Sequence, residues 1–196
     1  HWVMDPENPV SHGNIVFPEY YQEFRYGMHE ANKNAFGVYS EIEKEYKDLF
    51  GKYFGGTIDC HKCDDADVVF TSQGSVAAEA IDAVDELREE GYKVGNARMR
   101  MIRPFPVEDV RELAGKVKGI TAFDRGVSYG FGGHVASDMR SALYGSKHRP
   151  IIKDYIGGLG GRDITVDDIK QMLLETIKAV ENNEIEPEEI WHDLRE

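Results

Sequence analysis

The glycine-rich stretch from residue 119 to residue 134 constrains the fold of this chain more than any other part of its sequence. It begins with a short apolar run at 120–123, becomes dense in glycine, and then opens an apolar-faced helix at 135–144. A strand that passes through such a turn into a helix N-terminus is typical of the carboxyl edge of a parallel sheet. Glycine suits the turn because it accepts positive φ and lets a backbone or a ligand approach closely. The stretch therefore predicts one βα unit of an α/β fold.

Further units of the same kind flank this one. Apolar runs of strand length alternate with segments of helical periodicity. Thr165 is a good N-cap for the last helix, with Asp168 at its third position. The pattern predicts a compact α/β domain over residues 57–182, followed by an acidic C-terminal tail at 183–196. The expected strands are 66–72, 93–102, 120–123 and 150–156, and the expected helices are 76–90, 107–115, 135–144 and 166–182.

Residues 1–56 precede this domain and have a different character. Prolines and turn residues punctuate 1–18, which is typical of a linker. From 19 to 54, apolar residues recur at steps of three and four, which predicts a long amphipathic helix with Gly27 and Gly37 as candidate breaks. We expect its apolar stripe to pack on the chain's own sheet, and the alternative is docking on another domain or subunit. The stripe comprises Tyr21, Phe24, Met28, Ala31, Ala35, Val38, Ile42, Tyr46, Leu49 and Tyr53.

Charge and cysteine content limit the classes of function. The formal net charge of −13 disfavours nucleic acid, because phosphate binding depends on Lys and Arg, and it disfavours anionic membrane surfaces. No apolar run approaches the roughly 20 residues that cross a bilayer, and the first residues carry no secretory signal. Two cysteines are too few for a disulfide framework, so we expect a cytoplasmic protein. Cys60 and Cys63 form a lone CxxC, which we interpret as free thiols in a loop.

Two glycine-rich loops are expected at the same edge of the sheet, and each carries an Asp and an Arg. We expect structural or interface roles for both loops, because no catalytic triad, carboxylate pair or metal cluster can be assembled from the spacing. Residues 73–75 are interpreted as a turn and helix cap, with anion binding at free N–H groups as the alternative. The candidate residues are Asp124, Arg125, Ser128, Gly130, Gly132 and Gly133 in the first loop, and Gly160, Gly161, Arg162 and Asp163 in the second.

Five short motifs occur in an order that resembles a known family. Together they are similar to the C-terminal half of the alpha subunit of pyruvate:ferredoxin oxidoreductase (pyruvate synthase), over nearly the whole chain. The resemblance implies a transketolase C-terminal-like domain, which is a three-layer α/β fold with a mostly parallel five-stranded sheet and helices on both faces, preceded here by the long helical arm. The motifs are Asp5-Pro6-Glu7-Asn8-Pro9-Val10, Tyr20-Tyr21-Gln22-Glu23-Phe24-Arg25-Tyr26, Arg103-Pro104-Phe105-Pro106, Asp124-Arg125 with Ser128-Tyr129-Gly130-Phe131-Gly132-Gly133, and Gly158-Leu159-Gly160-Gly161-Arg162-Asp163-Ile164-Thr165.

The resemblance also implies an activity for the whole enzyme. The family decarboxylates pyruvate on thiamine diphosphate with Mg2+, passes electrons through 4Fe-4S iron–sulfur clusters to ferredoxin, and transfers the acetyl group to coenzyme A, or runs the reaction in reverse. By resemblance the cofactor-binding and catalytic residues lie elsewhere, so this chain is expected to bind no cofactor or metal and to hold no catalytic residue. Its expected partners are the beta, gamma and delta subunits, with ferredoxin contacting other subunits.

The sequence departs from the family pattern at two places. Gly126 stands where the family commonly has Asn or Ala, and Cys60-His61-Lys62-Cys63 has no family counterpart. Two alternatives to an assembly domain follow from the residues. One is a module that binds an anion such as the coenzyme A phosphates through Arg125 or Arg162. The other is a free-standing flavodoxin-like domain that dimerises through its long helix.

Overall fold

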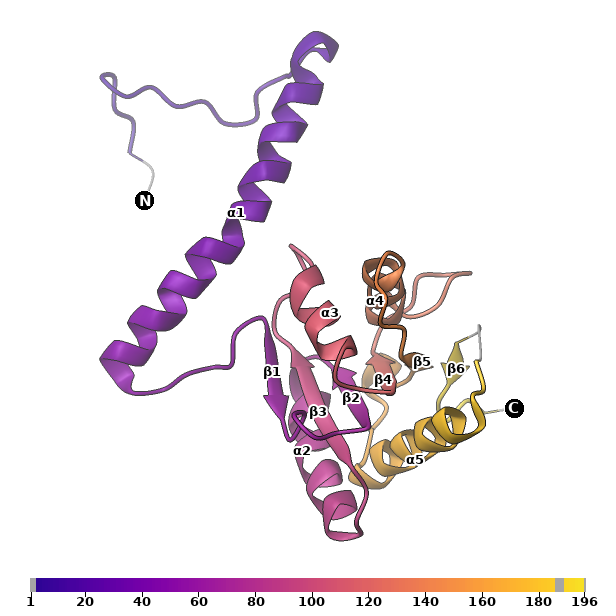
Figure 1. The fold of residues 1–196 in the computed structure, drawn as a ribbon. Coiled ribbons are helices and arrows are strands. Elements are labelled where there is room, and N and C mark those ends of the chain that lie inside the picture. Colours follow the sequence, from indigo (N-terminus) through magenta and orange to yellow (C-terminus); the bar gives the residue numbers. More distant parts are fainter. Residues whose placement is uncertain (1–2, 186–188, 196) are drawn as a thin grey trace.

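The computed structural model describes residues 3–185 and 189–195 and contains a six-stranded mixed sheet preceded by a long helix (Figure 1). The strands lie in the order β1-β3-β2-β4-β5-β6. The elements are α1 (Pro18–Phe50), β1 (Ile58–His61), β2 (Val68–Ser72), α2 (Gly74–Glu89), β3 (Val94–Met99), α3 (Val107–Ala114), β4 (Gly119–Asp124), α4 (His134–Leu143), β5 (Ile151–Ile156), the 3-10 turn η1 (Leu159–Gly161), α5 (Val166–Asn182) and β6 (Ile190–Trp191).

The four central strands, β3, β2, β4 and β5, are parallel to one another, which confirms the predicted α/β class. Their side chains are almost all buried because helices cover both faces of the sheet, as expected for parallel strands. Helices α3 and α4 lie on one face, and α2 and α5 lie on the other (Figure 1). Each face has its own apolar core, one centred on Val69, Ile120 and Met139, the other on Phe70, Leu87 and Leu173.

The sheet has six strands, one more than the resemblance implies, because a strand at each edge adds to the four that were predicted by residue range. At one edge, β1 pairs antiparallel with β3, so Cys60 lies in a strand and not in the predicted loop. At the other edge, β6 pairs with β5 inside the segment predicted to be a surface tail. Ile190 packs against the α5 side of the core, and the His192 N–H donates to the Ile156 carbonyl at 2.9 Å. Residues 186–188 and 196 of that tail lie outside the described part of the chain.

Helix α1 runs uninterrupted for 33 residues, so neither Gly27 nor Gly37 breaks it. It ends at Phe50, earlier than predicted, where Gly51 takes a left-handed C-cap conformation. Contrary to the expectation of packing on the chain's own sheet, α1 stands clear of the sheet (Figure 1). Its C-terminal half contacts the connection to β1, where the Gly56 N–H donates to Glu43 at 2.8 Å. Within residues 3–185 and 189–195, no helix is both long enough and apolar enough to cross a membrane.

Candidate functional site

The two glycine-rich loops meet at the carboxyl edge of the parallel strands, as the sequence predicts. Arg125, immediately after β4, donates from Nε and Nη2 to the Gly158 carbonyl at 3.1 and 3.0 Å. Gly158 follows β5 and has a left-handed backbone, and a Cβ at this position would lie 3.0 Å from Arg125 Nε. One guanidinium therefore ties the loop after β4 to the loop after β5. Asp124 and Arg125 do not pair with each other.

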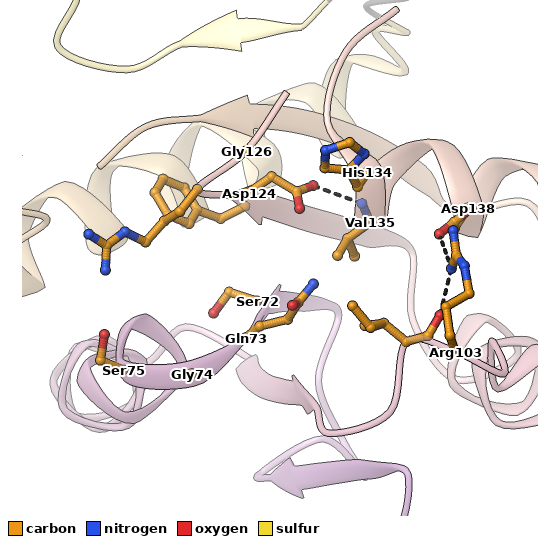
Figure 2. Close-up of a pocket in the computed structure, with 13 residues that line it drawn as sticks. Ser72, Gln73, Gly74, Ser75, Arg103, Asp124, Gly126, His134, Val135 and Asp138 are labelled. Atoms are coloured by element: carbon orange, nitrogen blue, oxygen red, sulfur yellow. Dashed lines mark hydrogen bonds and ion pairs between the residues drawn. The ribbon is translucent and has the colours of Figure 1, made fainter. Parts of the chain in front are cut away.

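A cavity of about 640 Å³ opens between the ends of β2 and β4 (Figure 2). In the sheet, β2 lies between β3 and β4. The chain passes from β2 to β3 on one side of β2 and then crosses to β4 on the other side, so the strand order reverses between β2 and β4. In open α/β sheets, ligands bind at such a crevice. The cavity is lined by Ser72, Gln73, Gly74 and Ser75 after β2, Ile102 and Arg103 after β3, Phe123, Asp124, Arg125 and Gly126 after β4, and His134, Val135 and Asp138 of α4.

Asp124 joins the wall of this cavity to the N-terminus of α4. Its Oδ2 accepts a hydrogen bond from the Val135 N–H at 2.9 Å (Figure 2). A carboxylate is favourable there because it accepts from an otherwise unpaired N–H and faces the positive end of the helix dipole. Burial outweighs this effect and raises the pKa of Asp124 to about 6, with the nearby Asp154 carboxylate adding to the rise. Asp124 is therefore a buried acid that holds a helix in place.

Gly133 lies between two buried carboxyl groups. Its N–H donates to Asp154 Oδ2 at 3.1 Å, and burial raises the pKa of Asp154 as well. A Cβ on Gly133 would lie 2.4 Å from Asp154 Oδ1 and 2.6 Å from Asp124 Oδ2, distances that no side chain can accommodate without a shift. Arg140 lies 3.4 Å from Asp154 and partly offsets its charge. The close approach of these two acids fixes the glycine-rich loop on α4.

The tip of the first loop projects away from this anchor. The Ser128 N–H donates to the Gly132 carbonyl at 2.8 Å, which closes a narrow turn with Gly130 in a left-handed conformation. At the tip, Tyr129 is 93% exposed and Phe131 is 72% exposed. Two aromatic side chains presented on an anchored turn are suited to contact another protein surface.

The second loop lies beside a smaller cavity of about 300 Å³, which Arg125 also lines. Gly160 and Gly161 have left-handed backbones within the turn η1. Arg162 bonds the Asp193 backbone carbonyl and lies 3.4 Å from its carboxylate, so it ties the loop to the C-terminal segment. Asp163 accepts from the Ile164 N–H at 3.1 Å. The Arg162 and Asp163 side chains therefore hold separate partners and are not an ion pair.

Sequence reasoning missed several residues of this edge. Asp154 and its neighbour Lys153 are charged residues within the apolar strand β5, a signal that could have marked Asp154. Arg103 and Asp138, which both line the larger cavity, form an ion pair of 2.7 Å at one end of it (Figure 2). Ser72, at the end of β2, is buried, and its Oγ has no hydrogen-bond partner among the described residues. Nothing in the local sequence distinguishes Ser72 from an ordinary strand-end serine.

The residues present do not suit the metal cofactors that the resemblance implies for the whole enzyme. Ligation of a 4Fe-4S cluster takes four cysteines, and this chain has two. Among residues 3–185 and 189–195, no three His, Cys, Asp or Glu side chains are grouped so that they could hold a metal ion. Of the two cavities at this edge, the one between β2 and β4 is the larger, with room for an organic ligand.

Comparisons with known proteins agree on one family. The model of the pyruvate:ferredoxin oxidoreductase core domain II matches residues 66–169, more than half of the chain. The chain is 42% identical over 193 residues to ketoisovalerate oxidoreductase subunit VorA of Pyrococcus horikoshii, covering 98% of this chain and 49% of that protein. It is 40% identical over 195 residues to pyruvate synthase subunit PorA of Pyrococcus abyssi, covering 100% of this chain and 49% of that protein. The chain thus spans about half the length of the curated relatives it matches.

A solved structure of 2-oxoglutarate:ferredoxin oxidoreductase from Magnetococcus marinus matches 68% of this chain and 21% of that chain, with a TM-score of 0.46 and 21% identity. That likeness is too low to support a shared ligand site. The family model and the two archaeal relatives cover the same βα units that carry both glycine-rich loops. The chain belongs to the pyruvate:ferredoxin oxidoreductase core domain II family.

Proposed function

We propose that this chain is part of the alpha subunit of a 2-oxoacid:ferredoxin oxidoreductase, which converts pyruvate and coenzyme A to acetyl-CoA and CO2, or runs in reverse. The observation that carries the proposal is the identity of about two residues in five with PorA and VorA subunits over the whole chain. The two relatives are named for different oxo acids, PorA for pyruvate and VorA for ketoisovalerate. Pyruvate is the substrate that the resemblance of the sequence motifs implies, and ketoisovalerate is the competing one.

Within that enzyme, the role of this chain is assembly, and it contributes no catalytic residue. Support comes from α1, whose apolar stripe is left largely uncovered by the residues that the structure describes: Phe24, Met28 and Ile42 are each more than half exposed. The aromatic loop tip at Tyr129 and Phe131 is a second uncovered surface. Monomeric proteins rarely leave such apolar area exposed unless another surface binds there. We assign α1 to the remaining half of the alpha subunit, and the loop tip to a neighbouring domain or subunit.

The remaining cofactors and partners follow from this assignment. Thiamine diphosphate, Mg2+, the 4Fe-4S clusters and coenzyme A are bound by other parts of the enzyme, and the beta, gamma and delta subunits are the partners. Ferredoxin contacts those other subunits, because ferredoxins are acidic and this chain has a net charge of −13. The enzyme works in the cytoplasm.

Reconstitution tests the proposal directly. The purified chain alone should give no pyruvate-dependent reduction of a viologen dye. Mixed with the missing half of the alpha subunit and the other subunits, it should restore dye reduction with pyruvate in preference to ketoisovalerate. Dye reduction by the chain alone would contradict the assembly role, and a preference for ketoisovalerate would correct the substrate.

Single substitutions on α1 test its role as the docking surface. Phe24→Glu places a charge in the stripe, and we expect the midpoint concentration for reconstitution to rise about tenfold or more, as for an interface hot spot. Gln22→Glu, an exposed position on the opposite side of α1, adds the same charge and should leave reconstitution unchanged. The melting temperature of each isolated variant should match that of the wild type. Equal effects of both variants would remove α1 from the interface, and a stable homodimer of the wild-type chain would favour the dimerisation alternative.

A second candidate function, the binding of an anionic ligand such as the coenzyme A phosphates, is favoured by the cavity between β2 and β4. The N-terminus of α2 borders it without a side-chain cap and without an acidic residue in its first turn. Calorimetry with coenzyme A on the chain, with Arg125→Ala as the variant and Arg149→Ala as the control, tests it. We expect heat of binding that Arg125→Ala abolishes and Arg149→Ala preserves. The absence of any heat of binding at millimolar coenzyme A would rule out this function.

A further inference from the structure

Cys60 and Cys63 lie on the same side of the sheet, although the sequence suggests only two thiols in a loop. Cys60 is the exposed third residue of β1, and Cys63 is 4% exposed and belongs to the core beneath α3. Between them, Lys62 has a left-handed backbone with φ of 55°, which turns the chain back toward the sheet. Both cysteines line one cavity, together with Leu113 and Lys116 at the end of α3.

The turn that joins the two cysteines is fixed by contacts on several sides. The Lys62 carbonyl accepts from Arg88 Nη2 at 2.7 Å, and the Lys62 ammonium lies 2.6 Å from Asp85. His61 contacts the same Asp85 carboxylate at 2.6 Å. A Cβ on Gly95 of β3 would lie 2.7 Å from the Lys62 carbonyl oxygen, so the turn packs directly on the backbone of β3. These contacts hold the Cys63 backbone in one place relative to Cys60.

The two cysteines line the same cavity and differ in exposure, because Cys60 is exposed and Cys63 is buried. The neighbouring Cys63 side chain lowers the pKa of the Cys60 thiol, as does the Lys116 ammonium, while partial burial and the Asp59 and Asp64 carboxylates oppose that shift. The Cys60 side chain and burial raise the pKa of the Cys63 thiol. The Cys63 Sγ also lies 3.3 Å from the Asn96 carbonyl oxygen. An exposed thiol therefore shares one cavity and one fixed turn with a buried thiol, the arrangement expected of an attacking and a resolving cysteine.

We propose that Cys60 and Cys63 form a thiol–disulfide exchange site whose co-reactant is a small exposed disulfide of the glutathione type. The Cys60 thiolate attacks one sulfur of that disulfide, forms a mixed disulfide and releases one small thiolate. The Cys63 thiol then gives up its proton, its sulfur attacks the Cys60 sulfur, and the second small thiolate leaves. The chain loses two hydrogens and forms one S–S bond, while the co-reactant is reduced to two thiols. This site is independent of the proposed oxidoreductase reaction.

The disulfide between Cys60 and Cys63 joins two parts of the domain at the edge of the sheet. Cys60 belongs to the antiparallel strand β1, and Cys63 belongs to the core under α3. Oxidation therefore links the strand to the core covalently, on the side from which α1 connects to the domain (Figure 1). Metal binding by the pair alone is disfavoured, because no third ligand of the usual types is grouped with the two sulfurs among the described residues.

Glutathione redox buffers test the site on the purified chain. After acid quenching, intact mass should show one species that has lost two hydrogens, and no accumulated glutathione adduct. Cys63→Ser should instead accumulate a glutathione adduct on Cys60, because no resolving sulfur remains. Cys60→Ser should stay unmodified, because Cys63 is buried. A wild-type chain that accumulates the adduct, or that stays fully reduced in the oxidising buffer, would overturn the proposal.

A urea control separates the folded geometry from mere closeness in sequence. We expect the ratio of internal to mixed disulfide to fall at least about tenfold when the wild-type chain is unfolded, because the fixed turn raises the effective concentration of one sulfur near the other. An equal ratio in the folded and unfolded chains would contradict a site built by the fold. The wild-type measurement needs no variant, so it decides the matter even if Cys63→Ser fails to fold.

Discussion

At the scale of single residues, the loop after β4 is held by acids that are costly to bury. Asp124 and Asp154 approach each other across Gly133, and burial is the main cause of the raised pKa of each. A group whose pKa is higher in the folded than in the unfolded state stabilises the folded state when it is protonated. For Asp124 this contribution to stability is fully present below the unfolded pKa, near 3.8, and is lost as pH rises through the folded pKa, about 6. Ionised Asp124 therefore lowers the stability of the protein at neutral pH.

Asp124→Asn tests this balance. Asparagine still offers an oxygen to the Val135 N–H and carries no buried charge, so the free energy of unfolding at pH 7 should rise by on the order of 1–2 kcal/mol. Below pH 4 the difference should shrink toward zero. Urea denaturation at several pH values measures it, with Asp48→Asn, at an exposed position of α1, as the control. A loss of stability that is equal at all pH values would show that the hydrogen bond matters more than the charge.

Gly133→Ala tests the close approach of the two acids. A methyl group at this position meets Asp154 Oδ1 at 2.4 Å and Asp124 Oδ2 at 2.6 Å, so the loop or the acids must move. We expect a loss of roughly 1–3 kcal/mol in the free energy of unfolding, the usual cost of overpacking. Gly145→Ala is the matched control, because a Cβ there meets no atom within 4 Å. Equal denaturation midpoints for the two variants would contradict the steric account.

The candidate residues show what residue-level reasoning can reach. The position of Arg125 and Arg162 at one edge follows from the strand–loop pattern and is found in the structure. Their partners do not follow from it, since Gly158 and Asp193 are 33 and 31 residues away in sequence. Asp154 could have been noticed as a charge in a strand, but its contact with Gly133 could not be predicted, because that contact depends on how β4, β5 and α4 pack together.

At the scale of elements, α5 is the helix whose start the sequence specifies most completely. Thr165 accepts from the Asp168 N–H at 3.2 Å, and Asp168 accepts from the Thr165 N–H at 2.8 Å. This reciprocal capping box places the helix start at Val166, where it was predicted. Its buried face then packs against the sheet through Ile169 and Leu173.

Thr165→Ala should lower the free energy of unfolding by about 1 kcal/mol, because one first-turn N–H loses its side-chain acceptor. Thr165→Ser keeps the hydroxyl and should cost only a few tenths of that amount. Urea denaturation of the two variants gives the comparison. If Thr165→Ser lowers the free energy of unfolding as much as Thr165→Ala does, the methyl group of Thr165 stabilises the protein and the capping hydrogen bond of its hydroxyl does not.

Other elements escaped prediction for physical reasons. The four parallel strands were found within a few residues, because strands buried on both faces read as continuous apolar runs. Strand β1 was missed, because its pairing with β3 is a contact over about forty residues and its polar sequence reads as a loop. Strand β6 has two residues, too few for a periodic pattern. The apolar stripe of α1 was predicted from the sequence. Periodicity shows that one face of a helix is apolar, but it does not show which surface covers that face.

At the scale of the whole molecule, the chain consists of a packed α/β domain and a helix that makes little contact with it. Limited trypsin digestion should therefore cut first within α1, at positions such as Arg25 and Lys44, and leave the domain from β1 onward intact. Mass spectrometry of early fragments measures this. Addition of the remaining subunits should protect α1. First cuts within β2 to α5 would show that the domain, and not the helix, opens most easily.

The double hydrogen bond from Arg125 to the Gly158 carbonyl has a consequence for association kinetics and affinity. Two loops that were free to move would each lose conformational entropy when a neighbouring subunit arrives. Here the guanidinium has already ordered them during folding, so less of the contact energy is spent on ordering when the complex forms. In the assembly proposed above, both loops would therefore already be ordered before a neighbouring subunit binds.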